Sequence, residues 1–386
     1  MSSSLHTFSF ATPLSNGGLA WIMPSSNTQD SEALMEILHR RAPCLRRLLC
    51  SNIIISPAAV DICANFTALR SLRLSTIVTP SNFTYSPSLI PSTAKLDSLD
   101  IDVSLLPEDF QDPETSASHP VELPSLTSLS LHGSLKRIQA VLRRLTAPQV
   151  HSVGIFEQRF HSDHYHMVPE ITPCIETVVC RFKRLQRFRF VALGGIQTQL
   201  GPVARILEPL LRVRGLLECR VYLFRKNMWS MDDEDLLKMC KAWPQLHVLH
   251  LEGWPSFDPW RRGLILKSLS IVARSCRQLT SLRIPVDGGD IVHVDDVIPQ
   301  TKLRTFAVSF PEEVYSDILA LASYINRLFP SLDLKSSQQL LQMSNEADSR
   351  KLLYKRLFTV LAMLQMTGEE TSEMTNSVED FILNTV

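Results

Sequence analysis

The side chains with the clearest metal-binding chemistry lie in one short segment of the chain. His161, His164 and His166, with Asp163 between them, are close enough in sequence for two or three imidazoles to share one ion. Three ligands on one loop, without further residues that orient the imidazoles, bind a metal weakly. We therefore interpret the segment as a solvated loop and expect no metal site.

A second group with this chemistry is the acidic run Asp232, Asp233, Glu234 and Asp235, which follows Ser230. Clustered carboxylates look like a cation site. They are equally suited to the first turn of a helix, where they accept hydrogen bonds from free amides and complement the helix dipole. An apolar pattern of helical period follows the run, so we expect a helix N-terminus without a metal.

Catalytic signatures are absent from the sequence. There is no GxGxxG, phosphate loop, GxSxG or HExxH motif. The eight cysteines form no CxxC pair, and we expect reduced thiols, several of them in the core. The sequence thus predicts a protein that is not an enzyme and that uses no cofactor.

The elements that position the remaining side chains follow from one recurring pattern: apolar, two residues, apolar, one residue, apolar. After a first gap of 40 residues, successive copies start 24 to 35 residues apart, and proline stands two residues before four of them. The copies are Leu5/Phe8/Phe10, Leu45/Leu48/Cys50, Leu69/Leu72/Leu74, Leu96/Leu99/Ile101, Leu126/Leu129/Leu131, Val150/Val153/Ile155, Leu185/Phe188/Phe190, Leu216/Cys219/Val221, Leu246/Leu249/Leu251, Leu279/Leu282/Ile284 and Leu303/Phe306/Val308, with a degenerate last copy near Phe329, Leu332 and Leu334.

Each copy predicts a short strand, and the interval between copies has room for one helix. Helical periodicity is clearest in residues 134–145, 202–211, 232–242, 261–275 and 315–328. Such strand–helix modules bury their apolar faces only against neighbouring modules. The expected fold class is α/β: a leucine-rich-repeat solenoid, or horseshoe, with a parallel inner sheet and outer helices.

Residues that alternate with the buried strand positions line the concave face. In the second half of the chain this face collects basic side chains, namely Arg187, Arg189, Arg220, His247, His250 and Arg283. Like charges on adjacent strands repel unless an anion meets them, so we expect a protein partner that is acidic or phosphorylated. The alternative is a solvated face whose charge is offset by Glu218 and water.

A second candidate binding surface is aromatic. Trp254, Phe257 and Trp260 follow the strand that ends at Leu251, on a segment that also contains two prolines. Aromatic side chains on the rim of a solenoid can act as binding hot spots. The alternative is that they pack onto the helix expected at residues 261–275.

Three segments follow from these patterns: the solenoid over residues 1–334, a helical C-terminal cap over 335–366, and an acidic, flexible tail over 367–386. In the cap, helices are expected at residues 336–343 and 350–366. The 39 basic and 39 acidic residues balance, and no signal peptide or membrane-spanning run is evident. We expect a cytoplasmic or nuclear monomer that binds neither nucleic acid nor membrane.

The segments LRSLRL at Leu69, LTSLSL at Leu126, LHVLHL at Leu246 and LTSLRI at Leu279 resemble leucine-rich repeats. With entries such as PSL and PQL, the chain is similar to the F-box and leucine-rich-repeat proteins that are numerous in mushroom-forming fungi. No stretch before Leu45 has the Leu-Pro opening and amphipathic helices of an F-box. The resemblance implies substrate recognition by the repeats and ubiquitin-ligase components as partners.

Two functions are therefore expected as alternatives. The first is a non-enzymatic protein–protein interaction module that recognises its partner on the concave face, like a ubiquitin-ligase substrate receptor that lacks its F-box. The second is a structural or assembly scaffold whose contacts are made by the helical face and the caps.

Overall fold

A computed structural model describes residues 5–11, 28–51, 56–75, 95–104, 121–157, 168–192, 199–223, 228–252, 254–255, 264–286, 298–309, 318–342 and 348–367. These residues form an α/β structure whose main sheet has eleven strands. The chain divides into two compact bodies, Met1–Gly194 and Gly195–Val386. Seven of the eleven strands belong to the first body and four to the second.

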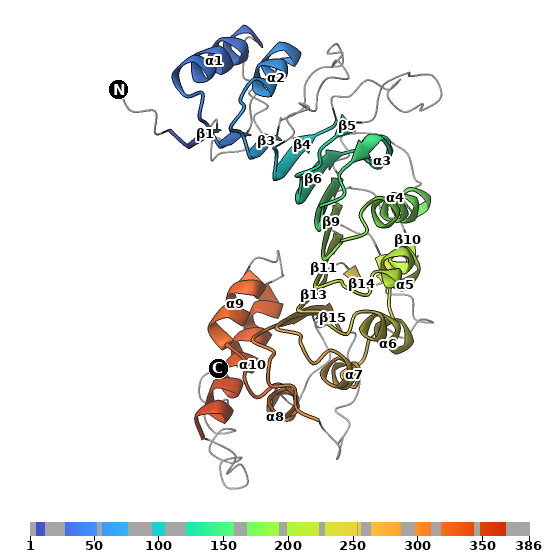
Figure 1. Cartoon of the computed structure of the whole chain (residues 1–386). Coiled ribbons are helices and arrows are strands. Elements are labelled where there is room, and N and C mark those ends of the chain that lie inside the picture. The colour runs from blue at the N-terminus through green and yellow to red at the C-terminus, as the bar shows by residue number, and fades with distance from the viewer. Residues whose placement is uncertain are drawn as a thin grey trace. The chain divides into compact units, whose positions relative to one another are not determined.

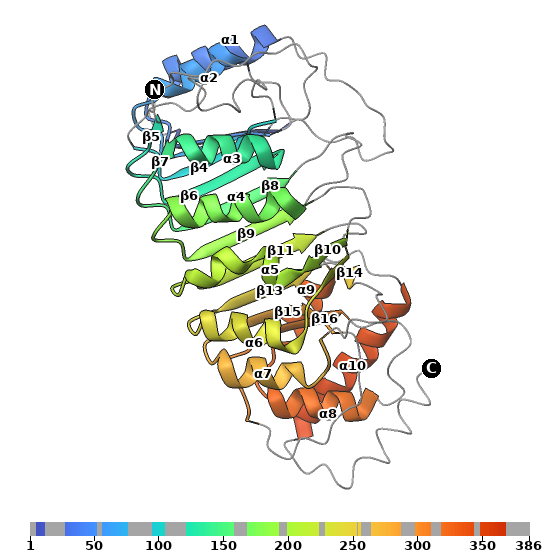
Figure 2. The same cartoon turned by 90° about the vertical axis from the view of Figure 1, so that its right-hand side faces the viewer.

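The described part of the first body combines seven parallel main-sheet strands with four helices, and their arrangement is drawn in Figure 1. Its sheet has the order β1 (Thr7–Ala11), β2 (Arg47–Ser51), β3 (Ser71–Ser75), β4 (Ser98–Asp102), β6 (Ser128–Gly133), β8 (Ser152–Glu157) and β9 (Arg187–Ala192). The helices are α1 (Thr28–Arg41), α2 (Pro57–Ala64), α3 (Leu135–Arg144) and α4 (Val168–Arg181). A separate pair joins β5 (Val121–Glu122) to β7 (Leu145–Thr146). Figure 2 shows α3 and α4 lying along one face of the sheet.

The second body has four parallel strands in the order β11 (Glu218–Leu223), β13 (Val248–Glu252), β15 (Ser281–Pro285) and β16 (Thr305–Ser309). A smaller sheet holds β10 (Gln199–Pro202), β12 (Met228–Ser230) and β14 (Trp254–Pro255). The helical elements are α5 (Val203–Ile206), the 3-10 helix η3 (Glu208–Arg212), α6 (Asp233–Ala242), α7 (Ser268–Ser275), α8 (Ile318–Leu328), α9 (Leu334–Gln342) and α10 (Asp348–Thr367).

Each of the eleven complete apolar triplets lies on or directly before a strand of the main sheet. Neighbouring strands place equivalent positions opposite each other, so that Leu72 faces Leu99 and Leu99 faces Leu129. From Leu45 to Val308, all three positions of every triplet are buried. The apolar pattern therefore fixes both the register of the strands and the face that packs against the helices.

The prolines before the triplets lie in tight turns that lead into a strand of the main sheet. Pro43 and Pro244 follow the helices α1 and α6, whereas Pro124 and Pro148 follow the short strands β5 and β7. In the turn that contains Pro124, the amide of Leu126 donates to the carbonyl of Leu123 at 3.2 Å, and Leu246 and Trp243 repeat this bond around Pro244 at 3.1 Å. Proline suits the second position of such a turn because its φ angle is already fixed. The turn therefore ends one module and starts the next strand.

Three of the expected elements differ from the structure. The helix expected at 202–211 is divided into α5 and η3, because Pro209 has no amide to continue the α-helical bonding. The helix expected at 261–275 begins at Ser268, after the turn at residues 266 and 267. The degenerate last triplet does not complete a strand, because α9 begins at Leu334.

The structure confirms that the acidic run at residues 232–235 forms the N-terminus of a helix. Asp232 caps α6, its carboxylate accepting the amide of Asp235 at 2.8 Å. All eight cysteines are unpaired, and six of them are buried. None of the helices in the described part of the chain combines the length and apolar character that crossing a membrane requires.

Candidate functional site

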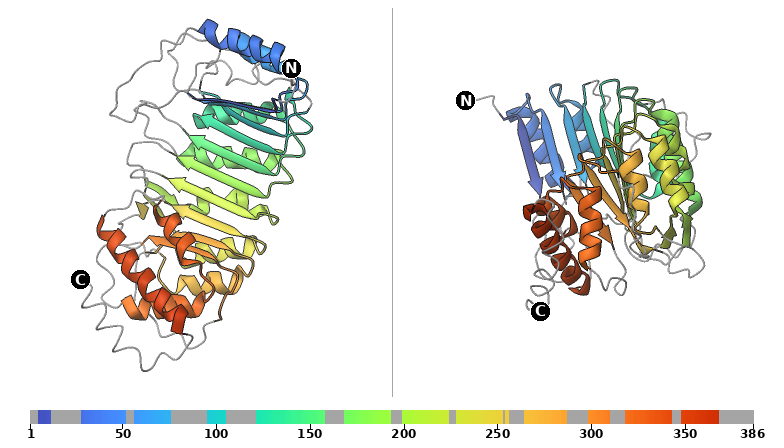
Figure 3. Two further views of the ribbon diagram at one scale, coloured as in Figure 1. Left: turned by 90° about the vertical axis from the view of Figure 1, so that its left-hand side faces the viewer. Right: turned by 90° about the horizontal axis from the view of Figure 1, so that it is seen from below.

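The candidate site is the strand face, which we define as the side of the main sheet that points away from the packed helices. Strand side chains alternate between the two sides, so the residues between the buried apolar positions lie on this face. In Figure 3 (left), no helix lies in front of strands β4 to β9 of the first body. On this face of the described strands, the side chains of Arg187 and Arg189 are exposed, whereas those of Asp100 and His132 are only 21 % and 12 % exposed.

In the first body, the strand face carries a continuous chain of contacts that starts with two charged residues. The Arg73 guanidinium on β3 lies 3.2 Å from the Asp100 carboxylate on β4. The imidazole of His132, on β6, lies 2.9 Å from the other oxygen of the same carboxylate. Asp100 therefore interacts with a basic side chain on each neighbouring strand.

The same chain continues through an aromatic ring. His132 stacks on Phe156 of β8, with ring centroids 4.3 Å apart and planes 6° from parallel. The guanidinium carbon of Arg189, on β9, lies 5.2 Å from the centroid of the Phe156 ring, in cation–π contact. We call Arg73, Asp100, His132, Phe156 and Arg189 the stacked row.

Gly154 leaves the space that the stacked row needs. A β-carbon at this position would lie 2.9 Å from Cε2 of Phe156 and 3.1 Å from the Ser130 hydroxyl oxygen. The Phe156 ring thus leans over its own strand, where any other residue would displace it. A glycine in the middle of a strand, usually unfavourable, here has a packing role.

Arg187 and Arg189 are the exposed basic side chains on the strand face of β9. They are two residues apart, so both point to the same side of the sheet. Contact with the phenyl ring restricts the Arg189 guanidinium, so less rotamer entropy is lost when it binds a carboxylate or phosphate. Both arginines thus lie on the strand face, as the alternation of the strand predicts, and guanidinium groups are suited to carboxylate or phosphate.

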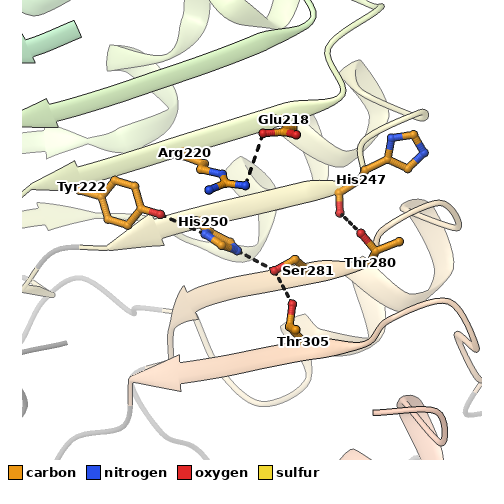
Figure 4. Close-up of polar contacts among 8 residues, drawn as sticks. All are labelled: Glu218, Arg220, Tyr222, His247, His250, Thr280, Ser281 and Thr305. Atoms are coloured by element: carbon orange, nitrogen blue, oxygen red, sulfur yellow. Dashed lines mark hydrogen bonds and ion pairs between the residues drawn. The ribbon is translucent and has the colours of Figure 1, made fainter. Parts of the chain in front are cut away.

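In the second body, the polar side chains of the strand face form a network across four strands (Figure 4). The Tyr222 hydroxyl on β11 lies 3.1 Å from Nδ1 of His250 on β13, and Nε2 of the same ring lies 2.7 Å from the Ser281 hydroxyl on β15. The Thr305 hydroxyl on β16 donates to Ser281. Arg220 is half-exposed and pairs with Glu218 of its own strand at 3.4 Å.

His250 and Arg283 are on the predicted face but are both only 3 % exposed. Both ring nitrogens of His250 are within hydrogen-bonding distance of neighbouring hydroxyl groups. Arg283 pairs with Glu252 at 2.9 Å and donates to the Leu340 carbonyl of α9 at 3.2 Å. The expectation that these two side chains are open to a partner is therefore not met in this structure, because the network and α9 cover them.

The orientation of α9 explains this burial. Within the second body, α9 and α10 lie on the opposite side of the strands from α6 and α7 (Figures 1 and 3). The C-terminal turn of α9 places a backbone carbonyl beside Arg283, where a positive charge is favourable. Arg283 lies on the strand face, as the alternation of the strand predicts, but the sequence pattern does not reveal the helix that covers it.

The other predicted site residues have different positions. His247 is exposed just before β13, and its carbonyl accepts the Thr280 hydroxyl at 3.0 Å. Trp254 lies on β14, with a side chain outside the described residues, and Phe257 and Trp260 lie outside them altogether. The histidine cluster at 161–166 also lies outside them, and within the described ranges no three His, Cys, Asp or Glu side chains form a metal-binding group.

Sequence reasoning missed His132 and Phe156 in the first body, and Tyr222 and Glu252 in the second. Each stands one residue beyond the third apolar position of its triplet, which is the next position on the strand face. The signal was present, because the alternation that selected Arg189 also selects the residue two further along the strand.

One acidic residue of the first body is buried at the same strand position. Asp102 on β4 accepts the amide of Ser104 at 2.8 Å, and burial raises the pKa of its carboxyl above the ordinary value. The hydrogen bonds from Ser104 and the charges of His132 and Arg137 oppose this shift. The acidic residues of this strand are thus either paired or buried, and they do not form an exposed acidic patch.

Fold and site together define the class: an α/β protein built on a large parallel sheet. Its strand face carries ordered arginine, histidine and aromatic side chains in the first body and is partly covered by α9 in the second. No protein-family model matches the chain. A comparison with curated proteins gives no significant match.

Proposed function

We propose that the protein is a leucine-rich-repeat solenoid that binds a protein partner through the strand face. The regular spacing of the apolar triplets and the parallel register of the strands support the solenoid architecture. The observation that carries the binding proposal is the stacked row, which holds the Arg189 guanidinium against Phe156 on strands of the first body in front of which Figure 3 shows no helix.

The chemistry of this face favours an acidic or phosphorylated segment as partner. Arg187 and Arg189 in the first body are exposed, and Arg220 in the second is half-exposed. Guanidinium groups form two parallel hydrogen bonds with carboxylate or phosphate, which gives both affinity and orientation. His250 and Arg283 contribute to the interior of the second body instead of to the contact.

Four of the buried cysteines have a packing role in this proposal. Burial raises the pKa of Cys50, Cys63, Cys174 and Cys219 to about 12, which keeps these four side chains as unreactive thiols at neutral pH. We propose a role like that of a ubiquitin-ligase substrate receptor, as the family resemblance implies. Co-isolation of ligase subunits with the tagged protein tests this role.

The binding proposal is tested by selecting a displayed library of acidic and phosphorylated peptides on the purified protein. Enriched peptides should bind the double variant Arg187→Glu/Arg189→Glu at least about 100-fold more weakly, because two charge-assisted contacts are lost and reversed. The matched control is Lys183→Glu/Arg184→Glu, with the same change of charge in the exposed turn before β9. Equal loss in both variants, or no enrichment, would contradict the proposal.

A further inference from the structure

The apolar side chains of the first triplet, on and before β1, are exposed at positions where those of the later triplets are buried. Leu5 and Phe10, which occupy the core-facing positions of the first triplet, are 45 % and 38 % exposed. The equivalent side chains of the next triplet, Leu45 and Cys50, are fully buried. The apolar layer of the first body therefore ends in an open face at β1.

The outer edge of β1 also offers unpaired backbone groups. The amides of Arg46 and Arg47 both donate to the carbonyl of His6 at 3.0 Å, so the backbone groups of His6 face β2. Alternation along the strand turns those of Phe8 and Phe10 toward β2, and those of Thr7, Ser9 and Ala11 outward. Among the described residues, no strand pairs with this outer edge.

The helix beside β1 has an uncovered flank as well. His39 of α1 contacts the Phe66 ring edge-on at 5.2 Å, so this flank of α1 faces α2 and the second triplet module. Helical spacing places Leu34 and Ile37 together on the opposite flank, and Ile37 is 56 % exposed. Among the described residues, strand and helix thus both lack a neighbour at the same end of the first body.

The last strand of the sheet, in the second body, is closed by comparison. The Arg304 carbonyl, just before β16, accepts the amide of Asp333 at 2.8 Å, and the amide of Phe306 donates to the Ser337 hydroxyl at 3.0 Å. The Tyr354 hydroxyl donates to the carbonyl of Val308. Side chains and backbone from α9 and α10 thus occupy the bonding groups that another strand would use.

The sequence of β1 is compatible with pairing to itself. Thr7-Phe8-Ser9-Phe10-Ala11 carries no charge, so two antiparallel copies place no like charges opposite each other. A register centred on Ser9 pairs Thr7 with Ala11 and Ser9 with Ser9, which are the residues whose backbone groups point outward. It also places Phe8 opposite Phe10 on the apolar face, and forms about six backbone hydrogen bonds.

We propose that two copies of the chain associate through antiparallel pairing of their β1 edges, with the flanks of α1 that carry Leu34 and Ile37 packed beside the strands. Because α9 and α10 occupy the far edge of β16, the pairing is restricted to β1 with β1 and yields a closed twofold dimer. This proposal replaces the monomer expected from the sequence. It does not depend on the proposed partner-binding function.

The test is the mass of the full chain in solution, measured by sedimentation from about 1 to 100 µM, a range set by ordinary affinities. The expected result is a species of twice the 43.6 kDa chain mass. Ser9→Pro removes an outward amide without touching the bonds to β2, and it should weaken association at least about tenfold. Ser9→Thr is the matched control, because it keeps the amide and should still form the dimer.

Two further measurements keep the proposal falsifiable. Ile37→Glu changes a helix side chain that is 56 % exposed and should also weaken the dimer, while circular dichroism verifies that each variant is folded. In hydrogen exchange, the Ser9 amide should be protected in the dimer and unprotected in Ile37→Glu. A monomer throughout the range would overturn the proposal. If the Ser9 amide of that monomer is protected, another part of the same chain covers the edge of β1. If Ser9→Pro dimerises as strongly as the wild type, the dimer forms through another surface, and the proposal is also wrong.

Discussion

Ser337, the fourth residue of α9, gives the sharpest test of how the last strand is closed. The Ser337 side chain is fully buried; its hydroxyl donates to the Asp333 carbonyl at 2.7 Å and accepts the amide of Phe306 at 3.0 Å. Ser337→Ala leaves that amide buried without a partner, which costs about 1–3 kcal/mol. The higher helix propensity of alanine returns about 0.5 kcal/mol, so we expect a net loss of about 1–2 kcal/mol.

The neighbouring serine provides the control. Ser336 is in the same helix, and its hydroxyl donates to the exposed carboxylate of Asp333 at 2.5 Å, where water can replace it. Ser336→Ala should therefore change the free energy of unfolding by no more than about 0.5 kcal/mol. Urea unfolding of both variants, with unchanged m-values, measures the difference. If the two variants lose equal stability, or if exchange of the Phe306 amide is unchanged in Ser337→Ala, the assignment of Ser337 as a substitute strand partner is refuted.

Two further predictions concern the first body. Because the pKa of Asp102 is raised in the native state, the native protein binds a proton at this carboxyl more readily than the unfolded chain does. This contribution to the free energy of unfolding is fully present below the ordinary pKa of 3.8 and is lost as the pH rises through the native pKa. Asp102→Asn cannot ionise and should not lose this contribution. In urea titrations, the free energy of unfolding of Asp102→Asn minus that of the wild type should increase from pH 3 to pH 7. A difference that does not change with pH would contradict this expectation. Gly154→Ala should displace the Phe156 ring and destabilise the protein by about 1–3 kcal/mol. If Gly154→Ala unfolds at the same midpoint temperature as the wild type, Gly154 does not have this packing role.

The sequence predicted the strands well because one physical cause sets them. Leu72, Leu99 and Leu129 must reach the same buried layer, so their spacing gives both the face and the register. The helix N-terminus at Asp232 could also be predicted from the sequence, because a helix cap involves only residues that are close together in the chain. Local periodicity and local capping are thus readable from one sequence.

Contacts between distant segments were not readable in this way. Nothing near Arg283 in sequence indicates that Leu340, 57 residues further along the chain, places a carbonyl against it. The stacking of His132 on Phe156 depends on the missing side chain of Gly154, on the same strand as Phe156. The sequence therefore predicted which side chains lie on the strand face, but not which of them are covered or how they contact each other.

The regular separation of paired strands also has a kinetic consequence. Leu48 and Leu72 are 24 residues apart, and Val153 and Phe188 are 35 apart, so each new pairing in the first body closes only a short loop. Closure entropy grows slowly with loop length, and low contact order favours fast folding. Such a sheet can grow strand by strand from any interior pair. Opening should then begin at the strand with least support, and amide exchange in the isolated chain should slow progressively from β1 toward β6.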